Sequence, residues 1–230
     1  HIAKPLTSLI NLSFTTGYYP KSLKYAKVVP IFKANSKYEV SNYRSISLLP
    51  LFNKIFEKLM YSRLIDFLQK HKVLYPHQFG FQKQKSTSLA ILDVCIKLVE
   101  AIENKQFSCC VFLDFAKAFD TVNHKILLSK LEHYGIRGIA LEWFRSYLHD
   151  RTQRVFVGGQ LSEDKNIKHG VPQGSVLGPL LFLLYINDIP KASKLLNFHL
   201  FADDTSLFYS HQNINVLEET VNNELMHISD

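Results

Sequence analysis

Three aspartates occur where a carboxylate is costly unless something compensates its charge. Asp114 follows an unbroken apolar stretch, residues 107–113, which is rich in strand-forming residues. Asp203 and Asp204 are adjacent and separate two short apolar segments that we expect to be strands. Neighbouring carboxylates repel and raise each other's pKa, and a divalent cation removes that repulsion. Converging from two strands, the three aspartates would supply the oxygen ligands that Mg²⁺ prefers.

Each of these acidic residues also has a plain structural explanation. Aspartate is a favoured turn residue, so Asp203-Asp204 taken alone is most simply a hairpin turn. Asp114 alone is equally compatible with a structural role. Asp120 comes just before an expected helix, and we interpret it as the N-cap of that helix. The metal-binding interpretation therefore depends on other motifs in the same chain.

A glycine-rich segment, HGVPQGSVLGP at residues 169–179, precedes an expected helix. Its three glycines allow the backbone to approach a ligand closely near a helix start. No Gly-Lys-Ser/Thr follows, which excludes the phosphate-binding P-loop. Taken alone, the segment is equally an ordinary connection between a strand and a helix.

The composition limits the class of protein. The chain has 230 residues, a hydrophobic fraction of 47% and a formal net charge of +7. It can therefore form a packed core, and its basic balance favours nucleic acid as a partner. Three cysteines without a C-x-x-C pair argue against a disulfide framework or zinc site and favour an intracellular location, nucleus or cytoplasm. No apolar run is long enough to span a membrane, so we expect no membrane partner. The first methionine is Met60, and we expect a piece of a longer reading frame.

The spacing of apolar residues predicts a mixed α/β chain in which helices flank a small sheet. Residues 107–113 are expected to be a central strand buried on both faces. Pro30 indicates an edge strand, and Gly158-Gly159 indicates a hairpin. A buried helix is expected to begin near Pro179. The other expected helices lie near residues 6–13, 51–64, 86–99, 124–134, around Trp143 and from 215 onward, and the expected strands at 27–32, 152–157, 197–201 and 205–209.

Several motifs occur in a fixed order along the chain. They are AKVVPIFK (26–33), NYRSISLLP (42–50), QFGF (78–81), FLDFAKAFD (112–120), GVPQGSVLGPLLF (170–182) and FADDT (201–205). In combination they resemble the catalytic core of reverse transcriptases, specifically those of non-LTR, LINE-type, jockey-like retrotransposons. The resemblance covers essentially the whole chain. A group II intron maturase is a weaker match, because SVLGPLL is closer to the LINE type.

The resemblance implies an α+β fold, the fingers and palm of a right-hand polymerase with a small antiparallel palm sheet flanked by helices. Residues 1–105 would approximately form an N-terminal extension and the fingers. Residues 106–230 would form mainly palm, with a fingers-side helical insert near 121–168. The thumb and an endonuclease are expected to lie outside this partial reverse transcriptase domain.

The resemblance also implies the metal ligands. Asp114, Asp203 and Asp204 would bind two Mg²⁺ ions, for which Mn²⁺ can substitute. The backbone carbonyl of Phe115 would add a further ligand. Two such ions lie about 3.5–4 Å apart, where one activates the primer 3′-hydroxyl and the other holds the triphosphate.

A nucleotide pocket is implied by the same resemblance. Phe119 would lie under the sugar and select against a 2′-hydroxyl. Gln173 and Gly174 would line the pocket for the incoming nucleotide and the template base. Arg44 would clamp the triphosphate, a task that suits a guanidinium, and Lys33 is a second candidate in that region. Ser45 follows Arg44 where the family usually has a proline, so the backbone there is less stiff.

The function expected from these motifs is that of an RNA-directed DNA polymerase core, which adds deoxynucleotides to a primer 3′-hydroxyl by two-metal phosphoryl transfer. Its partners would be an RNA template, a DNA primer and deoxynucleoside triphosphates. The alternative is a catalytically silent truncated remnant that at most binds nucleic acid. Without a thumb to hold the duplex, we expect weak or no processive activity from the isolated chain. The sequence leaves the oligomeric state open.

Overall fold

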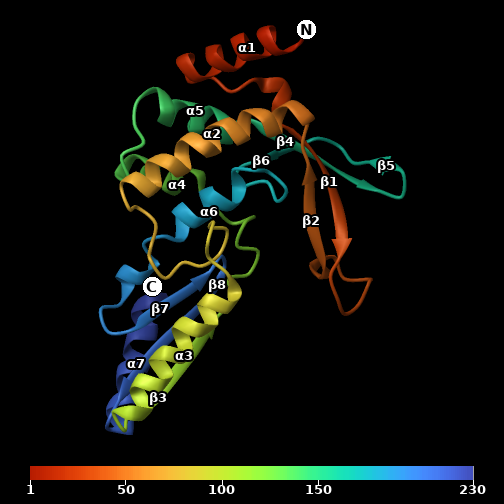
Figure 1. Cartoon of the computed structure of the whole chain (residues 1–230). Coiled ribbons are helices and arrows are strands. Elements are labelled where there is room, and N and C mark those ends of the chain that lie inside the picture. The colour runs from red at the N-terminus through yellow and green to blue at the C-terminus, as the bar shows by residue number, and fades with distance from the viewer. Residues whose placement is uncertain (230) are drawn as a thin grey trace. The chain divides into compact units, whose positions relative to one another are not determined.

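The computed structural model describes residues 1–229, which divide into two compact units (Figure 1). Unit 1 comprises His1–His71 and Lys117–Tyr185, and unit 2 comprises Lys72–Ala116 and Ile186–Asp230. Each unit thus joins two separate segments of the chain. The division into fingers and palm by the ranges 1–105 and 106–230 stays a prediction.

The helices of unit 1 surround an aromatic core. They are α1 (Ala3–Thr16), α2 (Leu51–Lys70), α4 (His124–His133), α5 (Ile139–Leu148) and α6 (Gly178–Ile186), with short 3-10 helices at Lys21–Leu23 and Val40–Asn42. Trp143 is fully buried, stacks on Tyr147 with ring centroids 5.6 Å apart and meets Tyr19 edge-on at 5.2 Å. The helix expected after Pro179 is confirmed as α6, and its leucines are buried.

The sheet of unit 1 contains β1 (Tyr25–Phe32), β2 (Tyr43–Leu48), β4 (Arg151–Val157), β5 (Gln160–Leu161) and β6 (Lys165–Ile167). The strand order is β2-β1-β4-β5, and β6 also pairs with β4. Pro30 therefore does not mark an edge strand, because β1 lies between β2 and β4. However, β4 pairs only with residues 25–28 of β1, so Pro30 has a neighbouring strand on one side alone. The hairpin around Gly158-Gly159 is confirmed, and both glycines have positive φ.

Unit 2 is built on an antiparallel sheet with the order β3-β8-β7, formed by β3 (Phe107–Leu113), β7 (Asn197–Phe201) and β8 (Asp204–His211). The prediction that residues 107–113 form a central strand buried on both faces is wrong. The central position belongs to β8, and Phe107 and Phe112 of β3 are 51% and 77% exposed. A continuous apolar run predicts a strand but does not determine its place in the sheet.

The two helices of unit 2, α3 (Thr87–Glu103) and α7 (Ile214–Ser229), pack on opposite faces of this sheet (Figure 1). Leu217 of α7 lies in one core cluster with Phe198. Asp93 of α3 hydrogen-bonds His199, the residue that follows Phe198 on β7. Because adjacent strand residues point to opposite faces of a sheet, α3 and α7 cover opposite faces. Ser86 caps α3, and the apolar residues Leu89, Leu92, Ile96 and Val99 of this helix are exposed. A 3-10 helix, Ile189–Ala192, completes the unit.

No helix within residues 1–229 combines the length and the apolar character required to cross a bilayer.

Candidate active site

The predicted carboxylates lie at one end of the sheet of unit 2. The ladder between β3 and β8 ends with the pair Leu113 and Thr205, and the next residues on the two strands are Asp114 and Asp204. Asp203 occupies the turn between β7 and β8. Asp114 and Asp204 are exposed and Asp203 is half-buried, so solvent reaches this end of the sheet. The backbone therefore brings two segments far apart in sequence to the same edge.

The turn that carries Asp203 is tight and strained. Phe201 pairs directly with Asp204, which leaves only Ala202 and Asp203 to reverse the chain. Ala202 has φ +57°, a left-handed conformation that costs an L-residue other than glycine about 1–2 kcal/mol. Its side chain is buried. Such a conformation persists only where neighbouring groups hold it.

The side chain of Gln78 provides that support. Its Oε1 accepts hydrogen bonds from the backbone nitrogens of Ala202, at 2.9 Å, and Gly80, at 2.8 Å. Gly80 lies so close that a Cβ there would overlap the backbone nitrogen of Ala202. Gln78 is itself buried, so these bonds are shielded from water. One amide oxygen thus joins residues 78–80 to the turn before the second and third aspartates.

Residues 77–79 also extend the sheet beyond β7. The nitrogen of Leu200 donates to the carbonyl of His77 at 2.9 Å, and the nitrogen of Phe79 donates to the carbonyl of Leu200 at 2.7 Å. Gln78 forms a parallel bridge with Leu200. The sequence identified the QFGF motif only by its resemblance to a family. It did not reveal this supporting role, since Ala202, which Gln78 holds, lies more than a hundred residues away.

The donor set of the aspartates suits magnesium. Three carboxylates and the nearby carbonyl of Phe115 are hard oxygen donors, which Mg²⁺ prefers to nitrogen or sulfur. The carboxylate oxygens of the three aspartates, however, do not all lie within 4.8 Å of one another. Among the described residues, His77, Asp93 and His199 are the group of three potential ligands whose ligating atoms all lie within 4.8 Å of one another. Joint metal binding by Asp114, Asp203 and Asp204 stays a prediction.

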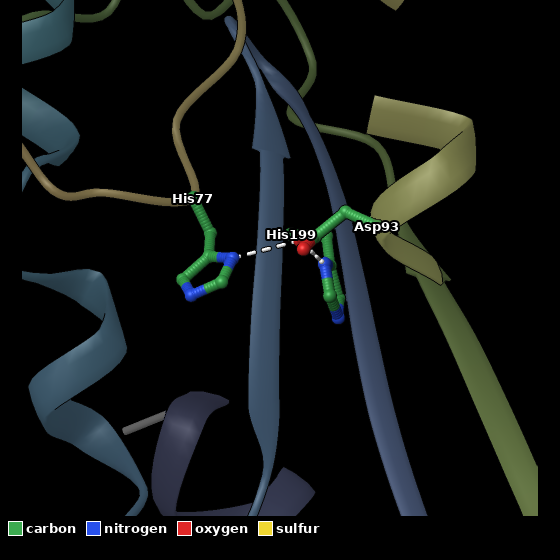
Figure 2. Close-up of side chains that lie close together, drawn as sticks. All are labelled: His77, Asp93 and His199. Atoms are coloured by element: carbon green, nitrogen blue, oxygen red, sulfur yellow. Dashed lines mark hydrogen bonds and ion pairs between the residues drawn. The ribbon is translucent and has the colours of Figure 1, made fainter. Parts of the chain in front are cut away.

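The histidine and aspartate cluster lies elsewhere in unit 2 (Figure 2). Both Nδ1 of His77 and Nδ1 of His199 approach the same Asp93 Oδ2, at 2.7 and 2.6 Å. Burial raises the pKa of Asp93, but the two imidazole hydrogen bonds outweigh it and hold that pKa below its usual range. Burial lowers the pKa of His199, although Asp93 opposes this shift. Sequence reasoning missed the cluster, because its members come from a loop, a helix and a strand.

In unit 1, the loop carrying Gln173 and Gly174 is joined to β2. The nitrogen of Ser47 donates to the carbonyl of Gln173 at 2.7 Å. Gly174 has φ +112°, and a Cβ there would lie 2.7 Å from the carbonyl oxygen of Ser47. Only glycine satisfies both conditions. The predicted pocket residues Gln173 and Gly174 therefore sit against the strand that also carries Arg44.

A buried carboxylate supports the same loop from behind. Glu57 of α2 is fully buried and accepts from the backbone nitrogen of Val176 at 2.6 Å and from the hydroxyl of Tyr147 at 2.6 Å. Arg151, also fully buried, donates to the carbonyl of Tyr147 at 3.2 Å. Burial raises the pKa of Tyr147 well above its usual value, and the charge of Glu57 adds to this effect. No sequence signal distinguished Glu57 from an ordinary surface glutamate.

The segment after Lys117 packs closely on the glycine-rich loop. Phe119 stacks on Phe182 of α6 with ring centroids 4.7 Å apart. A Cβ on Gly170 would lie 2.7 Å from the carbonyl oxygen of Asp120. The prediction that Asp120 caps the following helix is wrong, because the side chain of Asn123 accepts the capping bonds. Burial raises the pKa of Asp120, while the charge of Lys117 opposes it.

The two predicted cationic residues lie at the loop end of the β1–β2 hairpin, next to the connection formed by residues 33–42. Arg44 pairs with Ile31, and the nitrogen of Lys33 donates to the carbonyl of Asn42 at 2.8 Å. Both side chains are exposed. A cavity of about 350 Å³ opens beside this strand within unit 1. Its polar lining residues are Ser45, Ser47, Lys117, Asp120, Gln153, Lys168, His169 and Gln173.

Comparison with known families decides the class of the protein. Residues 31–228 match the model of the family described as "Reverse transcriptase (RNA-dependent DNA polymerase)". The chain belongs to the reverse transcriptase family.

Individual relatives of this reverse transcriptase come from mobile elements. It is 35% identical over 217 residues to the RNA-directed DNA polymerase from mobile element jockey of Drosophila melanogaster, a match covering 91% of this chain and 24% of the relative. It is 33% identical over 222 residues to the probable RNA-directed DNA polymerase from transposon BS of the same species, covering 89% and 23%. The predicted resemblance to reverse transcriptases of non-LTR, jockey-like retrotransposons is confirmed. The chain spans about a quarter of the length of these relatives.

Solved structures support the fold. The apo telomerase of Candida tropicalis superposes with a TM-score of 0.63 at 14% identity, covering 96% of this chain and 46% of the telomerase. A form of that telomerase truncated from its C-terminal domain gives a TM-score of 0.62 at 16% identity, covering 98% and 51%. At this identity the likeness concerns the fold alone. It confirms a mixed α+β fold.

Proposed function

We propose that this chain forms the polymerase core of a non-LTR retrotransposon reverse transcriptase, which adds deoxynucleotides to a DNA primer on an RNA template. The observation that carries the proposal is the position of the aspartates. Asp114 and Asp204 follow the last pair of the β3–β8 ladder, and Asp203 occupies the adjoining turn. Membership in the reverse transcriptase family supports the same activity. In this proposal, the sheet of unit 2 is the palm sheet and the β1–β2 hairpin belongs to the fingers.

In the proposed function, the aspartates of unit 2 bind the metal ions, and residues of unit 1 bind the nucleotide. Mg²⁺ held by Asp114, Asp203, Asp204 and the Phe115 carbonyl would supply charge neutralisation at the α-phosphate and acidify the primer hydroxyl. The strained turn and its Gln78 support keep Asp203 and Asp204 in place, so little reorganisation is needed when charge develops. No side chain needs to form a covalent bond, because positioning and charge stabilisation account for phosphoryl transfer.

Unit 1 would bind the nucleotide. Arg44 is exposed and free to form a bidentate contact with a triphosphate, and Lys33 adds a second positive charge on the same hairpin. Phe119 is held by stacking on Phe182, which suits a residue that must exclude a 2′-hydroxyl by its shape. The loop of Gln173 and Gly174 is fixed to Ser47 and leaves its outer surface for the base pair.

The test is Mg²⁺-dependent primer extension on an RNA template, using the chain with a thumb domain joined after residue 230. An Asp203→Asn, Asp204→Asn variant should lose extension by at least about 100-fold, since it removes two of three metal-binding charges. Asp66→Asn, which changes an exposed aspartate on α2, serves as the matched control and should retain full extension. Equal extension by the double variant and the control would refute the catalytic assignment.

Nucleic-acid binding and primer extension, measured together, separate the proposed function from the silent remnant. Binding should fall steeply as salt rises, because the chain carries a net charge of +7 and phosphate contacts release counterions. Salt-dependent binding without any primer extension by the thumb-bearing protein would favour the remnant. Extension that requires Asp203 and Asp204 would exclude it.

A further inference from the structure

Three side chains of unit 2 with atoms that can bind a metal converge outside the aspartate site (Figure 2). His77 comes from the segment beside β7, Asp93 from α3 and His199 from β7 itself. Asp93 Oδ2 lies 2.7 Å from His77 Nδ1 and 2.6 Å from His199 Nδ1. One carboxylate oxygen is thus shared between two imidazole rings. Three separate elements meet at this point, so whatever joins the side chains also joins the elements.

The spacing of the donors fits a small divalent cation. The ligating atoms of the three residues all lie within 4.8 Å of one another. Zn²⁺ binds imidazole nitrogen at about 2.0–2.1 Å and carboxylate oxygen at about 2.0–2.2 Å. Separating the shared oxygen from each ring by a fraction of an ångström would admit such an ion. Two imidazoles and a carboxylate favour transition metals over Mg²⁺, which prefers oxygen donors.

The exposed fraction of the side chains increases from His199 to His77, so one side of the cluster is buried and the other is open to solvent. His199 is 5% exposed, and its Nε2 is buried without a hydrogen-bond partner within the described structure. The side chains of Asp93 and His77 are 24% and 43% exposed. An ion could therefore enter from the His77 side and keep water as a remaining ligand.

We propose that His77, Asp93 and His199 bind a divalent transition-metal ion of the Zn²⁺ class. This site is separate from the Mg²⁺ ions assigned to the aspartates. The ion fastens the segment of residues 77–80 to α3 and β7.

The position of His77 gives the ion an effect on the turn. His77 immediately precedes Gln78, whose Oε1 accepts from the nitrogens of Ala202 and Gly80. Fixing His77 fixes the backbone from which Gln78 reaches the turn. The three ligands would thereby act as positioning residues for Asp203, although none of them touches a nucleotide in the proposed function.

The test uses the full chain, stripped of metal and then titrated with Zn²⁺ against a chromophoric chelator. One Zn²⁺ should bind tightly, and His77→Gln and Asp93→Asn should each weaken that binding by at least about 10-fold. Loading with Co²⁺ should give visible ligand-field absorption bands, which are lost in both variants. Zn²⁺ should also raise the melting temperature of the parent chain more than that of His77→Gln.

Two matched controls separate this site from other metal-binding residues. His227→Gln changes an exposed histidine on α7 and should leave Zn²⁺ affinity and the Co²⁺ bands unchanged. The Asp203→Asn, Asp204→Asn variant should also keep the Zn²⁺ site. His77 is partly exposed and Asn has nearly the shape of Asp, so circular dichroism should show that both site variants fold. Unchanged Zn²⁺ affinity in both folded variants would overturn the proposal and leave the cluster as a hydrogen-bonded link only.

Discussion

The two loops that carry motif residues are supported by different chemistry in the two units. In unit 2, the neutral amide of Gln78 holds the turn at Ala202, and Gly80 makes room for it. In unit 1, the carboxylate of Glu57 holds the loop that follows Gly174. A neutral amide is inexpensive to bury when its hydrogen bonds are made, whereas a carboxylate is costly without partners. The loop of unit 1 should therefore be the more sensitive to loss of its support.

The largest expected effect is that of Glu57→Ala. The substitution leaves the nitrogen of Val176 and the hydroxyl of Tyr147 without their acceptor, and it removes the negative charge that acts on Tyr147 together with the positive charge of the buried Arg151. Removing one member of a buried charged network costs about 3–5 kcal/mol of unfolding free energy. Urea denaturation at constant m-value measures the loss.

Glu57→Gln and Glu100→Ala define the controls for this prediction. Glutamine keeps one acceptor oxygen, so its cost should be smaller, about 1–2 kcal/mol. Glu100 forms an exposed ion pair with Lys97 on α3, and its loss should cost less than about 1 kcal/mol. If Glu57→Ala cost no more than Glu100→Ala, the carboxylate would not support the loop.

Gly80→Ala should have the next largest effect and acts on unit 2. A Cβ at this position would overlap the backbone nitrogen of Ala202, so the segment or the turn must move. Overpacking of this kind costs about 1–3 kcal/mol. The amide of Ala202 should also lose protection from hydrogen exchange, because its bond to Gln78 is disturbed. Unchanged protection at Ala202 would show that the close approach to Gly80 does not matter.

A comparison of Asp203 with Gln78 shows how far the sequence could lead. The sequence pattern was enough to predict that Asp114, Asp203 and Asp204 lie at the same edge of a sheet. Metal-dependent chemistry requires carboxylates, so the residue types themselves indicate the site. The supporting roles of Gln78 and Glu57 were not predicted, because the role of a buried polar residue depends on partners that only the folded chain supplies. The cluster of His77, Asp93 and His199 was not predicted for the same reason.

The strand at residues 107–113 shows the corresponding limit for the fold. Its apolar residues correctly predicted a strand that ends before Asp114. They could not predict the order of the strands, because an edge strand covered by a helix has the same composition as a central one. Asp120 shows the limit at single residues, where Asn123 took the capping position three residues later.

The pH dependence of stability tests whether His124, which also contacts the glycine-rich loop of unit 1, changes its protonation on unfolding. His124 Nε2 bonds the carbonyl of Gly170 at 2.7 Å, and burial lowers the pKa of His124 below its usual value. In the unfolded chain the imidazole titrates at about 6.5. Below that pH the unfolded state binds more protons than the folded state, so stability falls as pH falls towards the folded pKa.

His124→Gln should reduce this pH dependence, because glutamine can donate to Gly170 but does not titrate. The measurement is the free energy of unfolding between pH 5 and pH 7 for the parent and the variant. His133→Gln, which changes an exposed histidine on α4, is the control and should keep the slope of the parent. An identical slope in His124→Gln would mean that this imidazole does not titrate on unfolding.

The smallest effect is a coupling within the turn of unit 2. Gln78→Ala should cost about 1–3 kcal/mol, because it leaves buried nitrogens of Ala202 and Gly80 unpaired. Ala202→Gly removes the strain at φ +57° but adds flexibility to the unfolded chain, so its own effect should stay below about 1 kcal/mol. Glycine adopts this turn without support, so Gln78→Ala should cost less in the Ala202→Gly background. A double-mutant cycle should give a coupling of about 0.5–1 kcal/mol. Strict additivity would mean that Gln78 satisfies two nitrogens without holding the turn in its strained conformation, and the contrast between the two units would then lie only in their charge.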